Sequence, residues 1–436
     1  MLTKDKILEI LNDWNFWHKD ITPGISREKY QEKLLTHYNI GLAVSLIGLR
    51  RSGKSTIMQM LADELRREKN IATNNFLYVN FEDSRFLGEY SIELLENIYE
   101  VYQQIVKPVG KPIVLLDEVQ NIVGWEKFVN SLIERERASV FVSGSNSYLL
   151  SSELSSVLTG RQTVVKVFPL SFKEFLLFNK ININGELDIV NKKLEIKELF
   201  NVYLKFGGMP KPALVATEDE KNIILRNYFE DIINRDIIVR FKIRQTDKLK
   251  TLAKFYLTNI SSLISYNKVK DFLKIPLSTI ERFSDYFTTP FLLYFVPKFS
   301  YSLKEQSVNP RKVYAADLGL RNAISFNSSE DRGKLLENLI FLQLLRSEDE
   351  IYYYKTKDNL EVDFLIRQKG KIKYLIQVCV SLKNFNTRER EIKALLNAMK
   401  ELNLSEALII TEDEEEVIED DGKKIIAIPA YWWLLK

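Results

Sequence analysis

The chain has 436 residues, of which 45% are hydrophobic and 28% are charged, and its formal net charge is +3. This composition is typical of a soluble globular protein with two or three domains, and it excludes a wholly disordered chain. One cysteine and two histidines exclude an internal disulfide, a cysteine-rich zinc site and thiol redox chemistry, and they argue against histidine metal clusters and Ser-His or Cys-His catalysis.

The N-terminal residues mix charges and lack the apolar core of a signal peptide, and no apolar run approaches the roughly 18 residues of a membrane-spanning helix. We therefore expect a cytoplasmic protein without membrane contact. Because positive and negative charges nearly balance, any nucleic-acid binding must come from local basic patches.

Short apolar runs alternate with helical patterns in the first 170 or so residues. Apolar spacing predicts helices within residues 1–40, at 57–69 and at 92–106. The runs that predict buried strands lie at 42–47, 76–79, 113–116, 140–142 and 164–168. Strands that alternate with helices indicate a mostly parallel α/β sheet.

The rest of the chain has a different pattern. Residues 170–245 are predicted to be mainly helical, with a turn at Gly207-Gly208-Met209-Pro210. Two short helical patterns and a strand-like stretch follow between 248 and 299, and Ser278-Thr-Ile-Glu281 has the capping-box form that would start the second helix. A smaller α/β unit is predicted after Gly333. Its helix is expected at 335–345, and its strands at 351–354, 361–366, 374–380 and 407–410.

Residues 48–55 (GLRRSGKS) match the phosphate-binding pattern G-x-x-x-x-G-K-[ST] between a predicted strand and a predicted helix. The glycines let the loop wrap phosphates with backbone N–H groups, and the following helix directs its positive end at them. Lys54 is expected to reach the β- and γ-phosphates of ATP, and the Ser55 hydroxyl to bind Mg²⁺. The expected nucleotide-binding residues are Gly48, Leu49, Arg50, Arg51, Ser52, Gly53, Lys54, Ser55 and Thr56. Whether Arg50 and Arg51 contact phosphates or pack outside the loop stays open.

A second acidic motif ends the predicted strand at 113–116. Asp117 is expected to hold Mg²⁺ through water, and Glu118 to orient or deprotonate the attacking water. Paired acids at a strand end are typical of hydrolysing sites, and the alternative is a solvated pair of surface acids. Together with the upstream loop, the pair favours ATP hydrolysis.

Two further residues are candidates for catalysis. Asn146 follows the next predicted strand, where it could sense the γ-phosphate and align water, or belong to a simple polar turn. Arg161 is a candidate charge stabiliser for the nucleotide of its own or a neighbouring subunit, and such arginines can be worth about 10³–10⁵ in rate. The alternative is an ordinary surface arginine.

Several segments together resemble the AAA-type ATPase module common in archaea and bacteria: residues 49–56 (LRRSGKST), 116–120 (LDEVQ), 143–147 (SGSNS), 160–161 (GR) and 168–175 (FPLSFKEF). Later landmarks of that family are similar to residues 207–210, 235–236, 333–337, 361–364 and 431–434. The resemblance spans nearly the whole chain. It implies an α/β P-loop fold of the AAA/ASCE type, ATP binding and hydrolysis, a winged-helix segment, and a C-terminal domain of unknown function resembling restriction-endonuclease-like nucleases.

The resemblance also implies a nuclease pattern, in which an Asp precedes an acid-x-Lys on the next strand and a helix Glu lies nearby. Two carboxylates would hold a divalent metal there, and the lysine would steady the attacking water. Glu337 and Asp363 fit the first positions, but Gln377 and Cys379 stand where Glu and Lys are expected. Nothing in the sequence requires Lys383 to replace that lysine. We predict a catalytically silent domain in which Cys379, in the middle of a strand, faces a core.

Two charged segments have open interpretations. The acidic runs at 412–416 and 419–421 are predicted to form the solvated tip of a hairpin between strands 407–411 and 424–428, or else a dock for a basic partner. Residues 248–299 are a candidate winged helix that could bind DNA or a protein. DNA phosphates would meet Lys268, Lys270, Lys274, Arg282, Lys298 and Lys304. The second helix offers Arg282 beside Glu281 and Asp285, which argues against sequence-specific reading.

We therefore predict four regions: an AAA-type core with N-terminal helices (1–175), a helical lid (176–245), a winged-helix-like segment (246–325) and a degenerate restriction-endonuclease-like domain (326–436). The leading hypothesis is a Mg²⁺-dependent ATPase whose nucleotide state rearranges the C-terminal domains, on DNA or within a homo-oligomer. The alternatives are an ATP-gated protein-interaction scaffold with little turnover and an ATP-dependent nuclease, which Gln377 and Cys379 disfavour.

Overall fold

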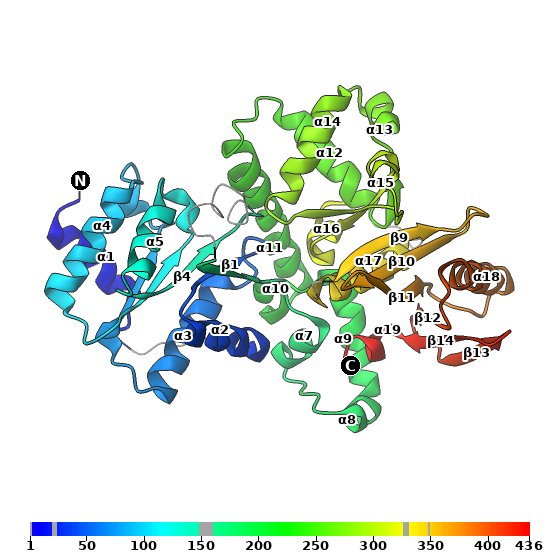
Figure 1. The fold of residues 1–436 in the computed structure, drawn as a ribbon, viewed down its shortest axis with the longest axis horizontal. Coiled ribbons are helices and arrows are strands. Elements are labelled where there is room, and N and C mark those ends of the chain that lie inside the picture. The colour runs from blue at the N-terminus through cyan, green and yellow to red at the C-terminus, as the bar shows by residue number, and fades with distance from the viewer. Residues whose placement is uncertain (1, 20–23, 148–159, 326–330, 348) are drawn as a thin grey trace. The chain divides into compact units, whose positions relative to one another are not determined.

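The computed structural model describes residues 2–19, 24–147, 160–325, 331–347 and 349–436. The chain forms two compact units, Met1–Phe168 and Pro169–Lys436 (Figure 1). The predicted boundary between 325 and 326 borders residues 326–330, which lie outside the described residues. Over the described part of the chain, no helix is long and apolar enough to cross a membrane.

The first unit is built on a five-stranded sheet in the order β2-β3-β4-β1-β5. The strands are β1 Ala43–Ile47, β2 Phe76–Asn80, β3 Ile113–Asp117, β4 Ser139–Gly144 and β5 Gln162–Lys166. Every neighbouring pair is parallel, so the predicted parallel α/β sheet is confirmed. Strand β4 lies between β1 and β3, so the strands that precede Gly48 and Glu118 are separated by one strand.

Helices cover both faces of this sheet. They are α1 Lys4–Trp14, α2 Glu28–Ile40, α3 Lys54–Glu68, α4 Ile92–Val101, which continues as a π-helical turn Tyr102–Val106, and α5 Trp125–Glu134. All five residues of β1 and of β3 are buried, as expected for parallel strands packed on two sides. Val44, Leu46 and Phe141 of the sheet form one apolar core with Ile57 and Leu61 of α3. This packing fixes the helix that follows the phosphate loop.

The second unit begins with a helical region. Its helices are α7 Phe172–Phe178, α8 Glu186–Asn191, α9 Lys193–Phe206, α10 Pro210–Leu214 and α11 Glu218–Asp231, which continues as a π-helical segment Ile232–Val239. The predicted turn at 207–210 is present between α9 and α10. Asp317 closes it by accepting the Gly208 N–H at 2.6 Å. A Cβ at Gly207, whose φ is +70°, would lie 2.3 Å from that carboxylate, so the turn requires glycine there.

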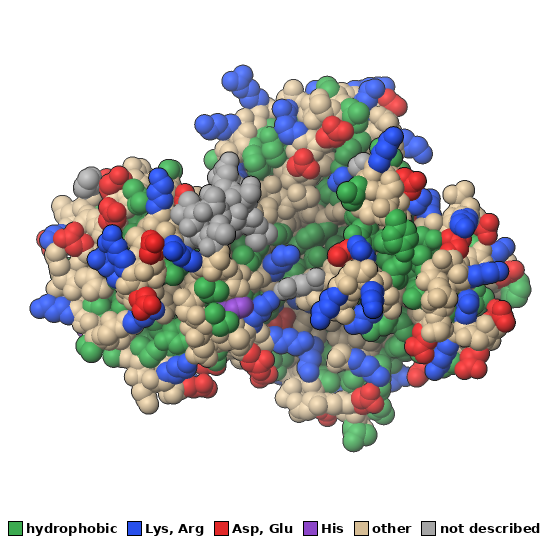
Figure 2. All heavy atoms as spheres, viewed as in Figure 1, with side chains coloured by type: hydrophobic (Ala, Val, Ile, Leu, Met, Phe, Trp, Pro, Cys, Tyr) green, Lys and Arg blue, Asp and Glu red, His purple; other side chains and the backbone are tan. Residues whose placement is uncertain are grey.

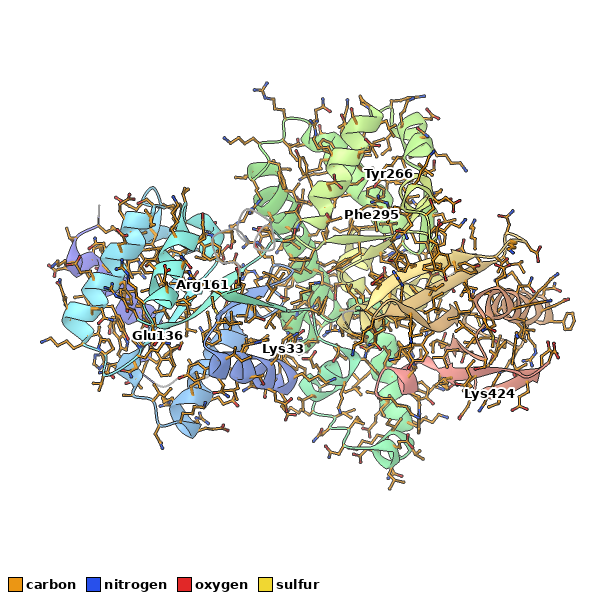
Figure 3. All side chains as sticks on the ribbon, in the orientation of Figure 1. Lys33, Glu136, Arg161, Tyr266, Phe295 and Lys424 are labelled. Atoms are coloured by element: carbon orange, nitrogen blue, oxygen red, sulfur yellow. The ribbon has the colours of Figure 1, made fainter. Side chains whose placement is uncertain are left out.

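Five helices and a small antiparallel sheet follow. The elements are α12 Thr246–Thr258, β6 Ser262–Ile264, α13 Tyr266–Leu273, α14 Leu277–Thr288, β7 Leu293–Val296, α15 Leu303–Val308, β8 Arg311–Ala315 and α16 Leu318–Ile324. The strand order is β6-β8-β7. Tyr266 of α13 packs edge to face against Phe295 of β7, with ring centroids 6.4 Å apart (Figure 3). Helix α13 therefore packs against β7 of the three-stranded sheet.

The predicted capping box at Ser278 is wrong. Helix α14 begins at Leu277 with Pro276 as its N-cap residue, and no side chain caps it. The carbonyl of Pro276 already accepts the N–H groups of Thr279 and Ile280, so Ser278 lies inside the first turn rather than before it.

The C-terminal part is a six-stranded mixed sheet in the order β13-β14-β12-β11-β10-β9, with two long helices and a short C-terminal one. The elements are α17 Arg332–Leu344, β9 Glu350–Lys355, β10 Glu361–Gln368, β11 Lys371–Val378, α18 Phe385–Leu402, β12 Glu406–Thr411, β13 Glu416–Asp420, β14 Lys423–Pro429 and α19 Ala430–Trp433. The predicted second α/β unit is present, and it contains β13, which was not expected.

The hairpin predicted between 407–411 and 424–428 is wrong, because β12 and β14 pair in parallel. Residues of the acidic runs form β13, and the hairpin joins β13 to β14. Some of these acids form ion pairs: Glu412 bonds Arg332 at 2.6 Å, and Glu416 bonds Arg388 at 2.7 Å. The acids at 419–421, at the tip of the β13–β14 hairpin, are exposed. Glu414 accepts the Ser381 hydroxyl at 2.6 Å. Lys/Arg and Asp/Glu side chains are mixed over the face shown in Figure 2, in keeping with the net charge of +3.

Candidate functional site

The phosphate loop lies at the carboxyl edge of the first sheet. Strand β1 ends at Ile47 and α3 begins at Lys54, so the loop spans six residues. A Cβ at Gly48 would lie 2.0 Å from the Val167 carbonyl oxygen. The close approach of the next strand therefore requires glycine at the first loop position, as the motif predicted.

Lys54 is buried at the start of α3, with a relative exposure of 3%. Its ammonium donates to the Gly48 carbonyl at 3.1 Å and to the Leu49 carbonyl at 3.2 Å. The Glu118 carboxylate oxygen Oε1 lies 3.8 Å from Nζ. The predicted lysine and the predicted base are therefore neighbours, although they are separated by 64 positions in the sequence.

Asp117 is held at the end of β3 by three hydroxyl groups. Tyr78 donates to Oδ2 at 2.6 Å, and Ser143 donates to Oδ1. The Ser55 side chain is also hydrogen-bonded to this carboxylate, so the two expected magnesium ligands lie side by side. Burial and the neighbouring Glu118 charge raise the pKa of Asp117, whereas the three hydroxyl groups oppose that change.

Glu118 is oriented by backbone and side-chain contacts. Its φ is +54°, and its N–H donates to the Ser143 hydroxyl at 3.0 Å. The Gln120 side-chain amide donates to Oε2. Burial alone would raise the pKa of Glu118, but the nearby Lys54 and Arg50 charges lower it overall. An ionised carboxylate is the form that can accept a proton from water.

The remaining loop residues divide into those that point inward and those that do not. Ser52 is fully buried, and its Oγ has no hydrogen-bond partner among the described residues. Its carbonyl accepts from Arg27 at 2.9 Å, which fixes the loop from α2. Arg50 pairs with Glu82, whereas Arg51 and Thr56 are exposed. Arg50 is thus held by a carboxylate in this structure.

The residues present fit ATP and Mg²⁺. The unpartnered Ser52 hydroxyl and the Lys54 ammonium are donors for phosphate oxygens, and Lys54 is presently satisfied by neutral carbonyl groups. The Ser55 hydroxyl and the Asp117 carboxylate supply the hard oxygen ligands that Mg²⁺ prefers.

The structure treats Asn146 and Arg161 differently. Asn146 is 1% exposed and follows β4, the strand beside β1, so it lies at the same sheet edge as the loop. Arg161 precedes β5, and its carbonyl accepts from Ala43 at the opposite end of β1, roughly 13 Å of strand away. Its guanidinium bonds Asn130 at 2.8 Å. Arg161 is therefore not brought to the loop of its own chain.

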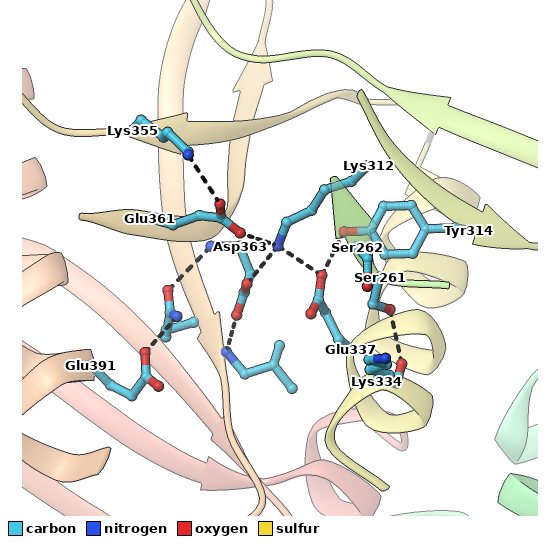
Figure 4. Close-up of polar contacts among 12 residues, drawn as sticks. Ser261, Ser262, Lys312, Tyr314, Lys334, Glu337, Lys355, Glu361, Asp363 and Glu391 are labelled. Carbon is cyan, nitrogen blue, oxygen red and sulfur yellow. Dashed lines mark hydrogen bonds and ion pairs between the residues drawn. The ribbon is translucent and has the colours of Figure 1, made fainter. Parts of the chain in front are cut away.

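A second polar cluster lies in the C-terminal part (Figure 4). Glu337 of α17 and Asp363 of β10 come together as predicted, and both bond the ammonium of Lys312 from β8, at 3.0 and 2.8 Å. Glu361 lies 2.9 Å from the same nitrogen. Lys312 was not predicted to join this cluster, because the sequence pattern did not predict β8. A lysine and Tyr314 two positions apart, on one face of a strand, would have been a weak signal.

The residues expected to be degenerate have other roles. Gln377 accepts the Asp363 N–H at 3.1 Å and donates to Glu391 at 2.6 Å, so it links two acids. Cys379 faces the core as predicted, but it follows β11 rather than lying within it, and burial raises its pKa to about 12. Lys383 is exposed. Lys312, and not Lys383, is the lysine at Asp363.

Comparison with protein families gives three successive matches. An AAA domain matches residues 41–176, and two domains of unknown function, DUF8612 and DUF4143, match residues 197–331 and 332–431. The AAA match contains the phosphate loop, Asp117 and Glu118. Together with the strand order of the first sheet, it confirms the predicted α/β P-loop fold class.

Two relatives align over most of their length. The uncharacterized protein MJ1544 of Methanocaldococcus jannaschii is 33% identical over 404 residues, covering 89% of this chain and 87% of the relative. An uncharacterized protein of Haemophilus influenzae is 30% identical over 417 residues, covering 94% of this chain and 99% of the relative. Among solved structures, the Aeropyrum pernix ORC1 protein in complex with DNA aligns with 13% identity and a TM-score of 0.34, covering 74% of this chain and 97% of that chain.

Proposed function

The chain belongs to the family of AAA-domain proteins that includes the Methanocaldococcus jannaschii and Haemophilus influenzae relatives, and on that premise we propose that it is a Mg²⁺-dependent ATPase. The observation that carries the proposal is the meeting of four side chains at one sheet edge. Ser55 bonds Asp117, and Lys54 lies 3.8 Å from Glu118. The first pair supplies oxygen ligands for Mg²⁺, and the second joins a lysine that would bind phosphates to a carboxylate that would activate water.

In this proposal each residue has one task. The loop N–H groups, Ser52 and Lys54 bind the phosphates, Asn146 aligns the terminal phosphate, and Glu118 accepts a proton from the attacking water. Ser55 and Asp117 would hold Mg²⁺, whose chemistry when bound is the neutralisation of charge on the phosphate oxygens. Because Lys54 now bonds neutral carbonyls, phosphate oxygens can replace these partners with stronger, charge-assisted hydrogen bonds.

We propose four regions for the chain: residues 1–175 as the ATPase core, 176–245 as a lid, 246–325 as a winged-helix-like segment and 326–436 as a degenerate restriction-endonuclease-like domain. The strand order β6-β8-β7 together with α12, α13 and α14 supports the winged-helix assignment. The nucleotide state would rearrange these C-terminal domains.

DNA and a protein are the two candidate partners of the winged-helix-like segment. Lys268, Lys270 and Lys274 are exposed, as DNA contacts would require. A cavity of about 580 Å³ beside α14, however, is lined by Glu281 and Asp285 as well as Arg311. Carboxylates in that position would repel phosphates and suit a basic protein segment. This observation favours the second candidate function, an ATP-gated scaffold for a protein partner.

Arg161 enters the proposal only through a homo-oligomer, because it lies at the far edge of its own sheet. There it would stabilise charge on the nucleotide of a neighbouring subunit. Mixing Arg161→Ala with Lys54→Ala should restore turnover that each variant lacks alone. Full turnover by Arg161→Ala alone would contradict this role.

The ATPase proposal is tested by phosphate release with and without DNA. The wild type should release phosphate, and Lys54→Ala should lower the rate by about 10²–10³-fold, the loss typical of removing one charged contact to a transition state. Lys69→Ala, at the other end of α3, is the matched control and should keep the wild-type rate. Equal release by the wild type and Lys54→Ala would dismiss the proposal. Stimulation by DNA would favour a DNA-linked switch over the scaffold.

A further inference from the structure

The cluster around Lys312 is arranged like the surroundings of a bound cation. The nitrogen Nζ lies 2.8 Å from Asp363, 2.9 Å from Glu361 and 3.0 Å from Glu337. These carboxylates come from α17 and β10, whereas Lys312 reaches them from β8 (Figure 4). Three acids from two elements thus converge on one point of positive charge.

The cluster is closed from the solvent on most sides. The side chain of Lys312 is 2% exposed, and those of Asp363 and Glu337 are 9% and 11% exposed. Glu361 is the open side, at 31%, where Lys355 lies 3.8 Å away. The buried carboxylates therefore depend on the ammonium for neutralisation, because water reaches them poorly.

Two further donors hold the carboxyl groups of Glu337 and Asp363. Tyr314 donates to Glu337 at 2.7 Å, and the Val378 N–H donates to Asp363 at 2.9 Å. Although burial alone would lower the pKa of Lys312, the surrounding acids together raise it well above its ordinary value. The ammonium thus stays charged over the whole range in which the protein would be studied.

The ligand chemistry of these acids suits a hard divalent cation. Carboxylate oxygens are preferred by Mg²⁺, Mn²⁺ and Ca²⁺, with metal–oxygen distances of roughly 2.0–2.6 Å. As the described residues stand, no group of three or more His, Cys, Asp and Glu side chains could hold a metal ion. The carboxyl oxygens lie 2.8–3.0 Å from Nζ, which is the range of N–H···O hydrogen bonds. A metal ion could bind here only if the lysine side chain were removed and the acidic side chains moved closer together.

We propose that the Lys312 ammonium takes the place of a divalent cation in this cluster, and that shortening Lys312 converts the cluster into a binding site for a single Mn²⁺ or Mg²⁺ ion per chain. In the native domain this cation is the Lys312 side chain of β8. This cation joins the three-stranded sheet to the six-stranded sheet and keeps the cluster closed to metal. The proposal concerns the second unit and does not depend on the ATPase assignment.

The experiment measures Mn²⁺ binding to the full chain without nucleotide, by electron paramagnetic resonance of free Mn²⁺. The variants Lys312→Ala and Lys312→Gln should bind one Mn²⁺ at least about tenfold more tightly than the wild type, because three carboxylates gain a free position. Lys355→Ala removes the other lysine at Glu361 and is the matched control. It should bind Mn²⁺ as the wild type does.

The location of the new site is tested by adding Asp363→Asn to Lys312→Ala, which should abolish the gain. Weak Mn²⁺ binding at the phosphate loop would survive that change, so the two sites can be told apart. If Lys312→Ala is unstable alone, Mn²⁺ should raise its melting temperature, and Mn²⁺ should have no such effect on the wild type. A Lys312→Ala protein that neither binds Mn²⁺ more tightly nor is stabilised by it would overturn the proposal, as would tight Asp363-dependent Mn²⁺ binding by the wild type.

Discussion

Two buried lysines, Lys54 in the first unit and Lys312 in the second, lie beside carboxylates in contrasting ways. Lys54 bonds two neutral carbonyls of its own loop, and its nearest carboxylate oxygen is 3.8 Å away. Lys312 is surrounded by three acidic side chains at 2.8–3.0 Å. An ammonium held by neutral groups can exchange them for an anion, whereas one held by three acids has no such gain to make. The surroundings of Lys54 therefore suit the binding of an anionic ligand, whereas the charge of Lys312 is already balanced by its own protein.

The largest expected effect on stability comes from removing Lys312. Lys312→Ala should lower the free energy of unfolding by about 3–5 kcal/mol in metal-free buffer, because it leaves buried carboxylates without their cation. Lys54→Ala should cost about 1 kcal/mol or less, the range of ordinary hydrogen bonds. Urea unfolding of both variants, with Lys69→Ala as a control, measures the difference. An equal decrease in the free energy of unfolding for Lys54→Ala and Lys312→Ala would contradict the proposed difference between the two sites.

The next largest effect is the pH dependence of the free energy of unfolding that Glu337 causes. Burial and the neighbouring Asp363 raise the pKa of Glu337 to about 8 from an ordinary 4.5. The folded state therefore keeps a proton that the unfolded state has released. The stability that Glu337 contributes is present below pH 4.5 and is lost as the pH rises to 8.

This loss should amount to about 1 kcal/mol per pH unit between pH 5.5 and 7.5. Glu337→Gln keeps an oxygen that can accept from Lys312 and Tyr314 but has no proton to lose. Urea unfolding of both proteins across this range should show that the variant lacks this part of the slope. Parallel curves would show that Glu337 is ionised throughout, and the cluster would then lack the predicted titration.

A smaller effect is expected at Asp117. Tyr78→Phe removes the hydroxyl that bonds Oδ2 at 2.6 Å and leaves the ring in the core. Losing one hydrogen bond to a carboxylate that positions Mg²⁺ should lower ATP turnover by about tenfold, and more Mg²⁺ should be needed for half-maximal rate. Steady-state phosphate release as a function of Mg²⁺ concentration measures both. A lower rate with an unchanged Mg²⁺ requirement would indicate a general packing defect instead.

Much of the first unit could be predicted because its signals are local. The phosphate loop needs glycine, lysine and serine at fixed spacing, and buried strands before Gly48 and Asp117 form continuous apolar runs. Parallel pairing then brings Asp117 and Lys54 to one edge. The position of Arg161 was harder to predict, because it depends on where β5 begins and on how β5 pairs with β1.

The second cluster could be predicted only in part, because it depends on long-range contacts. Glu337 and Asp363 belong to a pattern read along the chain, but Lys312 comes from a strand of another sheet. The predicted acidic hairpin failed for a related reason. Sequence distance favoured direct pairing of β12 and β14 as a hairpin, whereas their parallel pairing needs a crossover that includes β13.

The central claim is that Glu118 promotes hydrolysis at a loop that binds ATP. The most direct measurement compares nucleotide affinity and phosphate release in Glu118→Gln and the wild type. The account predicts that the variant binds ATP with wild-type affinity, since Lys54 and the loop are intact, and releases phosphate about 10²–10⁴-fold more slowly. Release at the wild-type rate, or a wild type that does not bind ATP, would contradict it.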